Sequence, residues 1–148
     1  MRKMGGIVLG MGVVILLLFV GLAVMSQSQP KDLGLKHGKL RPCSESPNCV
    51  CGEYPQDASH FVPPIQGDAD TWLQLQAEIA AAGGLLETVK TDYVHATFRS
   101  ALFRYVDDLE CRWDADSGLI YLRSASRVGR SDFGVNRQRV ENIRAALR

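Results

Sequence analysis

The chain has 148 residues, of which 46% are hydrophobic, and a formal net charge of +1. This length is sufficient for one ordinary domain with a single core. The near-neutral charge lacks the basic field that is typical of nucleic-acid-binding proteins. We therefore expect one small domain and no nucleic-acid partner.

An uncharged segment of 21 residues runs from Gly5 to Met25. As a helix it is long enough for a hydrocarbon core of roughly 30 Å. A signal peptide has a shorter apolar region, of about 7 to 15 residues, and a small-residue cleavage site. Val24-Met25-Ser26 is a poor site of that kind. We predict an uncleaved single-pass anchor over residues 1–25, with a cleaved signal segment as the alternative.

The orientation of this segment is read from its flanking charges. Arg2 and Lys3 favour a cytoplasmic N-terminus, whereas four basic residues between positions 31 and 41 oppose it. Apolar segments near an N-terminus usually direct export, and four cysteines suit an oxidising compartment. We expect a cell-membrane protein whose C-terminal domain is periplasmic.

The next part of the chain divides into two segments. Residues 26–41 are polar, contain Pro30 and two glycines, and are typical of a tether. Residues 42–67 carry three cysteines and five prolines, which indicates an ordered loop rather than a helix or strand. The domain is expected at residues 42–148.

Hydrophobic spacing predicts the remaining elements. Trp72, Leu75 and Ile79 recur at helical spacing, and glycines follow them. Alternating patterns predict strands. The expected elements are a helix at 70–82, strands at 85–90, 93–99, 103–113 and 119–126, and a helix at 135–147.

This order predicts an α+β fold. Short connections make the four-stranded sheet antiparallel, with both helices on one face. The other face is expected to be polar and available, and one N-terminal transmembrane helix is expected to precede the domain.

The four cysteines are expected to form disulfides. Four cysteines allow three pairings, and a bridge between Cys49 and Cys51 would be strained. One remaining scheme joins Cys43 to Cys49 and Cys51 to Cys111, and the other joins Cys43 to Cys51 and Cys49 to Cys111. The spacing lacks the Cys-x-x-Cys pairs of a zinc site, so we expect no metal and no cofactor.

Asp107 and Asp108 are adjacent in the third expected strand. Successive strand residues point to opposite faces, so the two carboxylates are not an acid/base pair on one substrate. A buried carboxylate needs a partner, and Arg123 or Arg127 lies on the neighbouring strand. We predict a structural ion pair.

The densest polar stretch runs from the last strand through a glycine loop to the last helix. This geometry can hold an anion on backbone N–H groups. The alternative is that Ser131 or Asp132 caps the helix while the arginines pair with acids. The candidate ligand-binding residues are Arg123, Ser124, Ser126, Arg127, Arg130, Ser131, Asp132, Asn136 and Arg137.

We therefore predict a membrane-anchored envelope module, non-catalytic, that binds a small anionic ligand or a protein partner. One alternative is an enzyme that uses Asp107 or Asp108 with Arg127 and Asn136. The other is a structural accessory of a membrane complex.

Three stretches carry a family resemblance: residues 42–50 (PCSESPNCV), residues 104–108 (RYVDD) and residues 123–140. Together they resemble the domain-of-unknown-function family 1499, from about residue 33 onward. The resemblance implies an extracytoplasmic domain of the bacterial envelope and no particular activity. It also implies that Cys43 and Cys49 are the family's usual cysteines, so that the additional Cys51 and Cys111 form a second pair.

Overall fold

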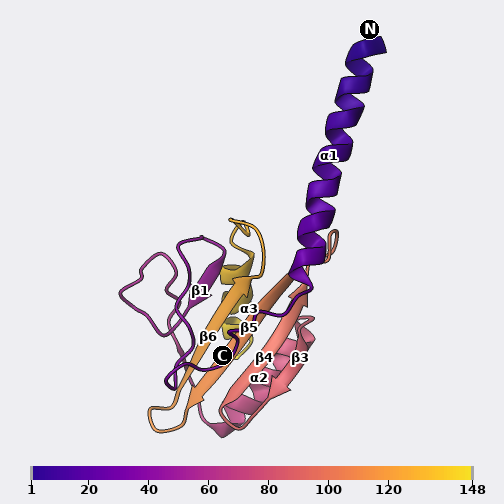
Figure 1. The fold of residues 1–148 in the computed structure, drawn as a ribbon. Coiled ribbons are helices and arrows are strands. Elements are labelled where there is room, and N and C mark those ends of the chain that lie inside the picture. Colours follow the sequence, from indigo (N-terminus) through magenta and orange to yellow (C-terminus); the bar gives the residue numbers. More distant parts are fainter. Residues whose placement is uncertain (1, 148) are drawn as a thin grey trace.

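The computed structural model describes the backbone of residues 2–147 and the side chains of residues 10–147 (Figure 1). Met1, the first residue of the expected anchor, and Arg148, the last residue of the expected domain, lie outside the described residues. In chain order the elements are α1 (Arg2–Ser26), β1 (Cys49–Cys51), β2 (Ile65–Gln66), α2 (Ala69–Ala81), β3 (Leu85–Val89), β4 (Tyr93–Arg99), β5 (Val106–Asp114), β6 (Leu119–Ser126) and α3 (Val135–Ala146).

The sheet is antiparallel and has six strands, in the order β1-β6-β5-β4-β3, with β2 paired to the other end of β6. The α+β class is as expected, but the four-stranded sheet is wrong. The missing strands, β1 and β2, have three and two residues. Strands this short, beside cysteines and prolines, show no alternation in the sequence. Both pair with the edge of β6 that β5 leaves free.

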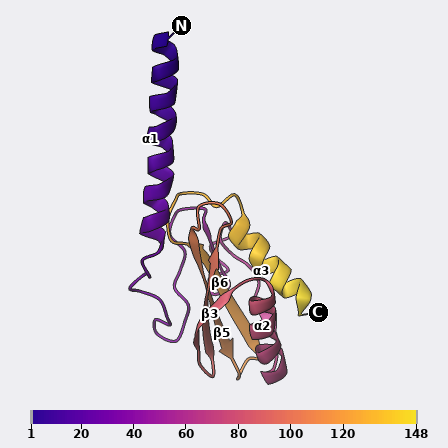
Figure 2. The same ribbon diagram turned by 90° about the vertical axis from the view of Figure 1, so that its right-hand side faces the viewer.

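Helices α2 and α3 pack on the same face of the sheet (Figure 2). Asp68 caps α2 by accepting a hydrogen bond from the Thr71 amide at 3.0 Å. At the other end of α2, Gly84 passes so close to Phe98 and Ile79 that no Cβ fits there. The buried core between the layers includes Trp72, Leu75, Ile79, Val94, Ala96, Leu109, Cys111, Ile120, Leu122, Val140 and Ile143.

The second face of the sheet is polar but is covered by the chain itself. Residues 27–43 run across it, and Leu40 is fully buried there. The Gly34 amide donates to Glu110 at 2.8 Å, and the Leu40 amide donates to Glu53 at 3.3 Å. Residues 26–41, expected as a tether, thus lie against the sheet. The prediction that this face is available is wrong.

The C-terminal end of α1 is held on the domain by several hydrogen bonds. Ser26 is fully buried, and its hydroxyl accepts a hydrogen bond from the Val106 amide at 3.3 Å. Arg127 donates to the carbonyl oxygens of Ser26 and Gln27 at 3.2 and 3.3 Å. Arg99 donates to the Gln27 side chain at 2.6 Å. The helix therefore leaves the sheet in a defined direction.

The expected transmembrane helix requires a correction. Within the part of the chain that the structure describes, no helix combines the length and the apolar character needed to cross a membrane. The side chains of residues 5–9 of the expected span lie outside the described set.

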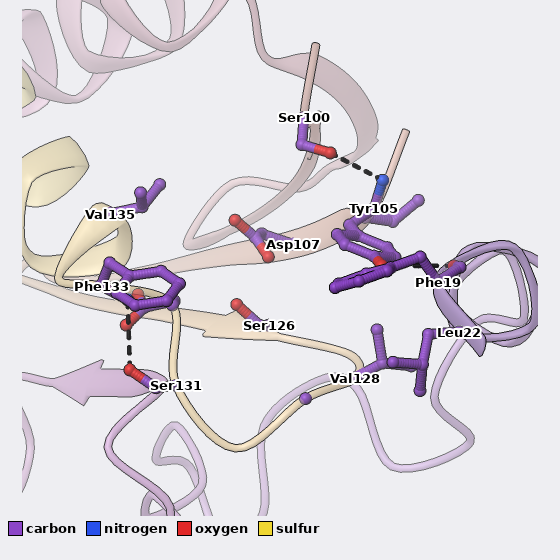
Figure 3. A pocket seen from close by; sticks show the side chains of 13 residues that line it. Phe19, Leu22, Ser100, Tyr105, Asp107, Ser126, Val128, Ser131, Phe133 and Val135 are labelled. Atoms are coloured by element: carbon purple, nitrogen blue, oxygen red, sulfur yellow. Dashed lines mark hydrogen bonds between the residues drawn. The ribbon is translucent and has the colours of Figure 1, made fainter. Parts of the chain in front are cut away.

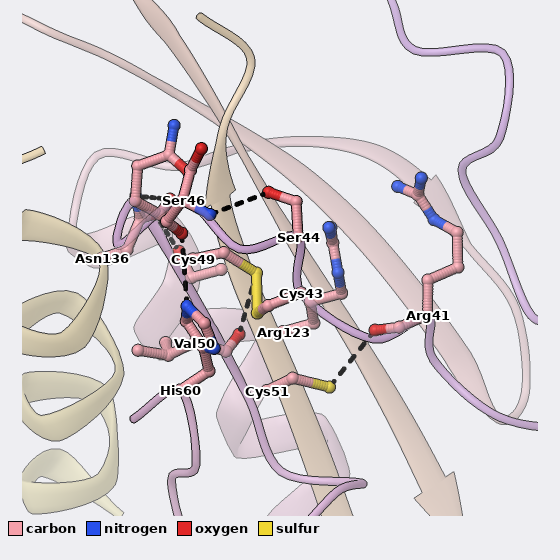
Figure 4. Close-up of a disulfide and its surroundings, with 12 residues drawn as sticks. Arg41, Cys43, Ser44, Ser46, Cys49, Val50, Cys51, His60, Arg123 and Asn136 are labelled. Carbon is pink, nitrogen blue, oxygen red and sulfur yellow. Dashed lines mark hydrogen bonds between the residues drawn. A yellow bond between two sulfur atoms is a disulfide. The ribbon is translucent and has the colours of Figure 1, made fainter. Parts of the chain in front are cut away.

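One disulfide is present, between Cys43 and Cys49, whose Cα atoms are 5.7 Å apart (Figure 4). Cys51 and Cys111 are free and buried. Cys111 lies opposite Leu122 in the core beneath the helices, whereas Cys51 lies opposite Arg123 on the other face. The predicted bond between Cys51 and Cys111 is wrong because the sheet separates the two side chains.

Both free thiols are poor nucleophiles. Burial raises the pKa of Cys51 to about 11 and raises the pKa of Cys111 further. The Cys51 thiol donates to the Arg41 carbonyl at 3.4 Å (Figure 4). Since the thiolate is the reactive form, both cysteines should resist alkylation in the folded protein.

Alkylation of the native protein should therefore leave Cys51 and Cys111 unmodified, because neither is exposed. Unfolding without a reductant should then expose both, while Cys43 and Cys49 stay linked. Cleavage after glutamate, at Glu45, separates the two linked cysteines for mass spectrometry. A fragment that links Cys51 to any partner would contradict the structure.

Candidate ligand-binding site

The nine candidate ligand residues do not converge on one site. Alternation along β6 places Arg123 on the face covered by residues 27–43, and Ser124 on the face beneath the helices. Arg127 follows the strand and pairs on the first of these faces, whereas Ser126 turns toward α3. The sheet thus divides the set into two groups.

On the covered face, Arg127 and Asp108 form an ion pair. Two guanidinium nitrogens of Arg127 contact the two carboxylate oxygens at 2.7 and 2.8 Å, and His95 lies 2.8 Å from one of these oxygens. Asp108 is only 2% exposed. Burial alone would raise the pKa of Asp108, but hydrogen bonds from Arg127 and His95 outweigh it and hold that pKa below its usual range. The predicted pairing with Arg127 is present, as a structural contact.

A second buried acid lies beside this pair on the same face. The Glu110 side chain is fully buried, accepts a hydrogen bond from the Tyr93 hydroxyl at 2.8 Å and pairs with Arg123 at 3.2 Å. The Gly34 amide donates to it as well. Arg123 is thus committed to an internal acid and is unable to serve an external ligand.

On the helix face, Asp107 pairs with Arg139 of α3 at 2.7 Å. The expectation that an inward aspartate would pair with Arg123 or Arg127 is met by Asp108 and not by Asp107. Asp107 and Asp108 point to opposite faces, as their adjacency predicts. The enzyme alternative, which combined either acid with Arg127 and Asn136, therefore lacks a common site.

Asn136 is the centre of the polar contacts at the start of α3. Its side chain is buried, accepts from the Ser124 hydroxyl at 2.6 Å and donates to Ser126 at 3.0 Å and to Asp132 at 2.8 Å. It also donates to the Asn48 carbonyl at 3.1 Å. These contacts join β6, α3 and the loop that the Cys43–Cys49 disulfide closes.

Asp132, Arg130 and Arg137 have separate positions around this centre. Asp132 accepts a hydrogen bond from the Asn136 amide at 2.7 Å and so caps the first turn of α3. Arg137 donates to the carbonyls of Phe61 and Ser59, each at 2.9 Å. Arg130 is exposed. The anion-binding arrangement expected here is therefore replaced by a capped helix and mostly committed arginines.

A cavity of about 340 Å³ lies between α1 and the chain that connects β6 to α3 (Figure 3). Of the candidate residues, Ser126, Ser131 and Asp132 line it, together with Asp107. Most of its wall is apolar. The apolar lining comes from Phe19, Leu22, Tyr105, Val106, Val128, Phe133 and Val135.

The apolar lining was not predictable from the residue types that suggest chemistry. Phe19 and Leu22 belong to α1, and Phe19 stacks on Phe103 with ring centroids 5.0 Å apart. Arg139, the partner of Asp107, was missed because its reach depends on how α3 lies across the sheet. The one available signal was Phe133, an aromatic residue in a polar loop.

The described residues include no group of three or more His, Cys, Asp or Glu side chains that could hold a metal ion. The fold and cavity define a two-layer α+β domain with one disulfide and a small, mainly apolar cavity. The chain belongs to the family described as "Protein of unknown function (DUF1499)", whose model matches residues 39–147. Searches of curated proteins and of solved structures found no match.

Replacing Asp108 with Ala should lower the free energy of unfolding by about 3–5 kcal/mol, because it leaves the Arg127 guanidinium buried and unpaired. Asp116, exposed in the β5–β6 turn, provides the matched control, and its change to Ala should cost less than about 0.5 kcal/mol. Urea denaturation measures both. Equal midpoints for the two variants would contradict a structural role.

The same pair predicts an acid sensitivity. The pKa of Asp108 is lower in the folded protein than in the unfolded chain. Its stabilising contribution is therefore complete above the unfolded value of about 3.9 and is lost as the pH falls through the folded value. Asp108→Asn should be less stable than the parent near neutral pH and should lose less stability on acidification.

Proposed function

We propose that the protein is a non-catalytic binding module that takes a small, mainly apolar ligand in the cavity between α1 and the β6–α3 loop. The cavity itself is the observation that supports this proposal. Its volume of about 340 Å³ lies at the lower end of the range of ligand sites, which is roughly 300–1,000 Å³. Apolar walls with a few polar groups are typical of such sites.

The polar side of the cavity favours a ligand with a hydrogen-bond donor at one end. Asp107 uses one carboxylate oxygen, Oδ2, to bind Arg139. Its Oδ1 has no hydrogen-bond donor among the residues that the structure describes, and Asp107 lines the cavity (Figure 3). Ser126 lies beside it and accepts from Asn136, so its hydroxyl proton is free to be donated. An alcohol matches both groups, whereas an ammonium group, which only donates, matches Asp107.

The arrangement of charges argues against an anionic ligand. Two of the arginines expected to bind it are committed, Arg127 to Asp108 and Arg137 to backbone carbonyls, and the exposed Arg130 does not line the cavity. The acids Asp107 and Asp132 line the cavity instead. An anion that entered would face two carboxylates. We therefore replace the anionic ligand of the sequence-based hypothesis with an uncharged or cationic one.

Thermal shifts with three eight-carbon probes test this proposal. Octylamine and octan-1-ol should raise the melting temperature of the full chain more than octanoate does, because Asp107 accepts a hydrogen bond and repels a carboxylate. A ligand at 100 times its dissociation constant adds about 2.7 kcal/mol, which is readily measured.

Two valines provide a matched control for the location. Val128→Trp should fill the cavity and abolish the shifts, whereas Val89→Trp, on the exposed edge strand β3, should leave them unchanged. Shifts that survive in Val128→Trp, or that are largest with octanoate, would refute the proposal.

We also propose that the domain works outside the cytoplasm. The Cys43–Cys49 disulfide supports this location, because disulfides persist in oxidising compartments and are rare in the cytosol. The apolar segment near the N-terminus is also typical of export signals. The location would keep this bond oxidised while the two buried thiols stay reduced.

Alkaline phosphatase, which is active only after export, should be active when fused after Arg148. The same fusion without residues 2–25 should be inactive, because the export segment is then removed. A fluorescent protein that folds only in the cytoplasm, fused at the same position, should stay dark. The reverse pattern would refute the proposed location.

A further inference from the structure

We infer that the end of the domain from which α1 departs docks on an anionic lipid surface. The contact is made by two loops, residues 100–105 between β4 and β5 and residues 127–134 between β6 and α3. The pairing of Asp107 with both Phe98 and Ser126 places these two loops at the same end of the sheet. Figures 1 and 2 show both loops beside the base of α1.

Each loop presents a large apolar side chain to solvent. Leu102 is 81% exposed and Phe133 is 97% exposed, the two highest values among the large hydrophobic residues of the described chain. Neither contributes to the core of the domain. Burial of a side chain of this size against an apolar phase is worth about 1.5–3 kcal/mol. That free energy is available to a partner and is unused by the fold.

The loops are held in shape rather than loosely extended. Phe133 and Arg104 both have positive φ angles, 55° and 59°, which non-glycine residues rarely adopt. The Ser131 hydroxyl accepts from the Phe133 amide at 3.3 Å, and the Ser100 hydroxyl accepts from the Tyr105 amide at 2.9 Å. Preformed loops lose little conformational entropy on docking.

The two exposed arginines of the loops favour an anionic surface, against the single acid Asp132 in the second loop. Arg104 and Arg130 are exposed and form no ion pair within the described residues. Six other arginines do form ion pairs: Arg41, Arg112, Arg123, Arg127, Arg139 and Arg144. A basic side chain near an anionic leaflet contributes about 1 kcal/mol.

A lipid surface fits this arrangement better than a protein partner. A stable protein interface buries about 800 Å² on each partner, whereas Leu102 and Phe133 are single side chains on separate loops. A headgroup layer accepts isolated apolar side chains and basic neighbours without fixed complementary positions. The contact requires no helix to cross the bilayer. Leu102, Arg104 and Arg130 do not line the cavity, whereas Phe133 does, so the probe at residue 102 reports on the lipid contact apart from the proposed ligand site.

A fluorescent probe tests the contact in the full chain. A nitrobenzoxadiazole group is attached to Leu102→Cys and, as a control, to Leu73→Cys, which is 64% exposed on α2. Cys51 and Cys111 are buried and stay unlabelled. Vesicles of phosphatidylcholine with phosphatidylglycerol should shift the emission of the probe at residue 102 to the blue, and high salt should reverse the shift. The probe at residue 73 should not respond.

Charge reversal supplies a matched pair of variants. Arg104→Glu with Arg130→Glu should raise the lipid concentration at half-response by about tenfold or more. The control is Lys36→Glu with Lys90→Glu, which changes the net charge by the same amount. These two lysines are exposed but lie away from both loops, in the N-terminal segment and after β3, so the control should have little effect on the lipid concentration at half-response. The inference is overturned if both double variants behave alike. It is also overturned if phosphatidylcholine alone gives the full shift, or if the probes at residues 102 and 73 respond equally.

Discussion

The structure depends on a layer of buried charge between the sheet and its own N-terminal segment. Asp108 and Glu110 point away from the helices and are almost completely buried. Isolated ionised carboxylates are very unfavourable in such a place, so each requires a partner. Arg127 and Arg123 on β6 supply it. This layer therefore fixes how β5 and β6 align, and it requires that residues 27–43 cover the face.

The sequence predicted the part of the fold that follows from local periodicity. The bounds of β4 and β6 agree with the expected strands, because each strand has a long alternating pattern. The covering of the second face was not predictable in this way. Tyr93, His95 and Thr97 look solvent-exposed in sequence, yet all are buried, because a segment distant in sequence packs on them. The same limit applies to β1 and β2, which exist only through their pairing with β6.

The candidate site shows which inferences from residue type were sound. Adjacency in a strand correctly separated Asp107 from Asp108, since alternation is a property of the backbone. The grouping of arginines into an anion site was not sound, since composition does not show which acids already neutralise them. The predicted cysteine pairing had the same weakness: Cys51 and Cys111 look complementary in sequence, but they occupy opposite faces.

The hydrogen bonds at the junction between α1 and the domain fix the direction of the helix relative to the sheet. Arg127, which is itself anchored on Asp108, binds the carbonyl of Ser26, the last helical residue, and the buried Ser26 hydroxyl binds the first residue of β5. Rotation of the helix relative to the sheet would break these contacts together. Whatever restrains α1 consequently sets the orientation of the whole sheet, and a displacement of the helix is transmitted directly to β5 and β6.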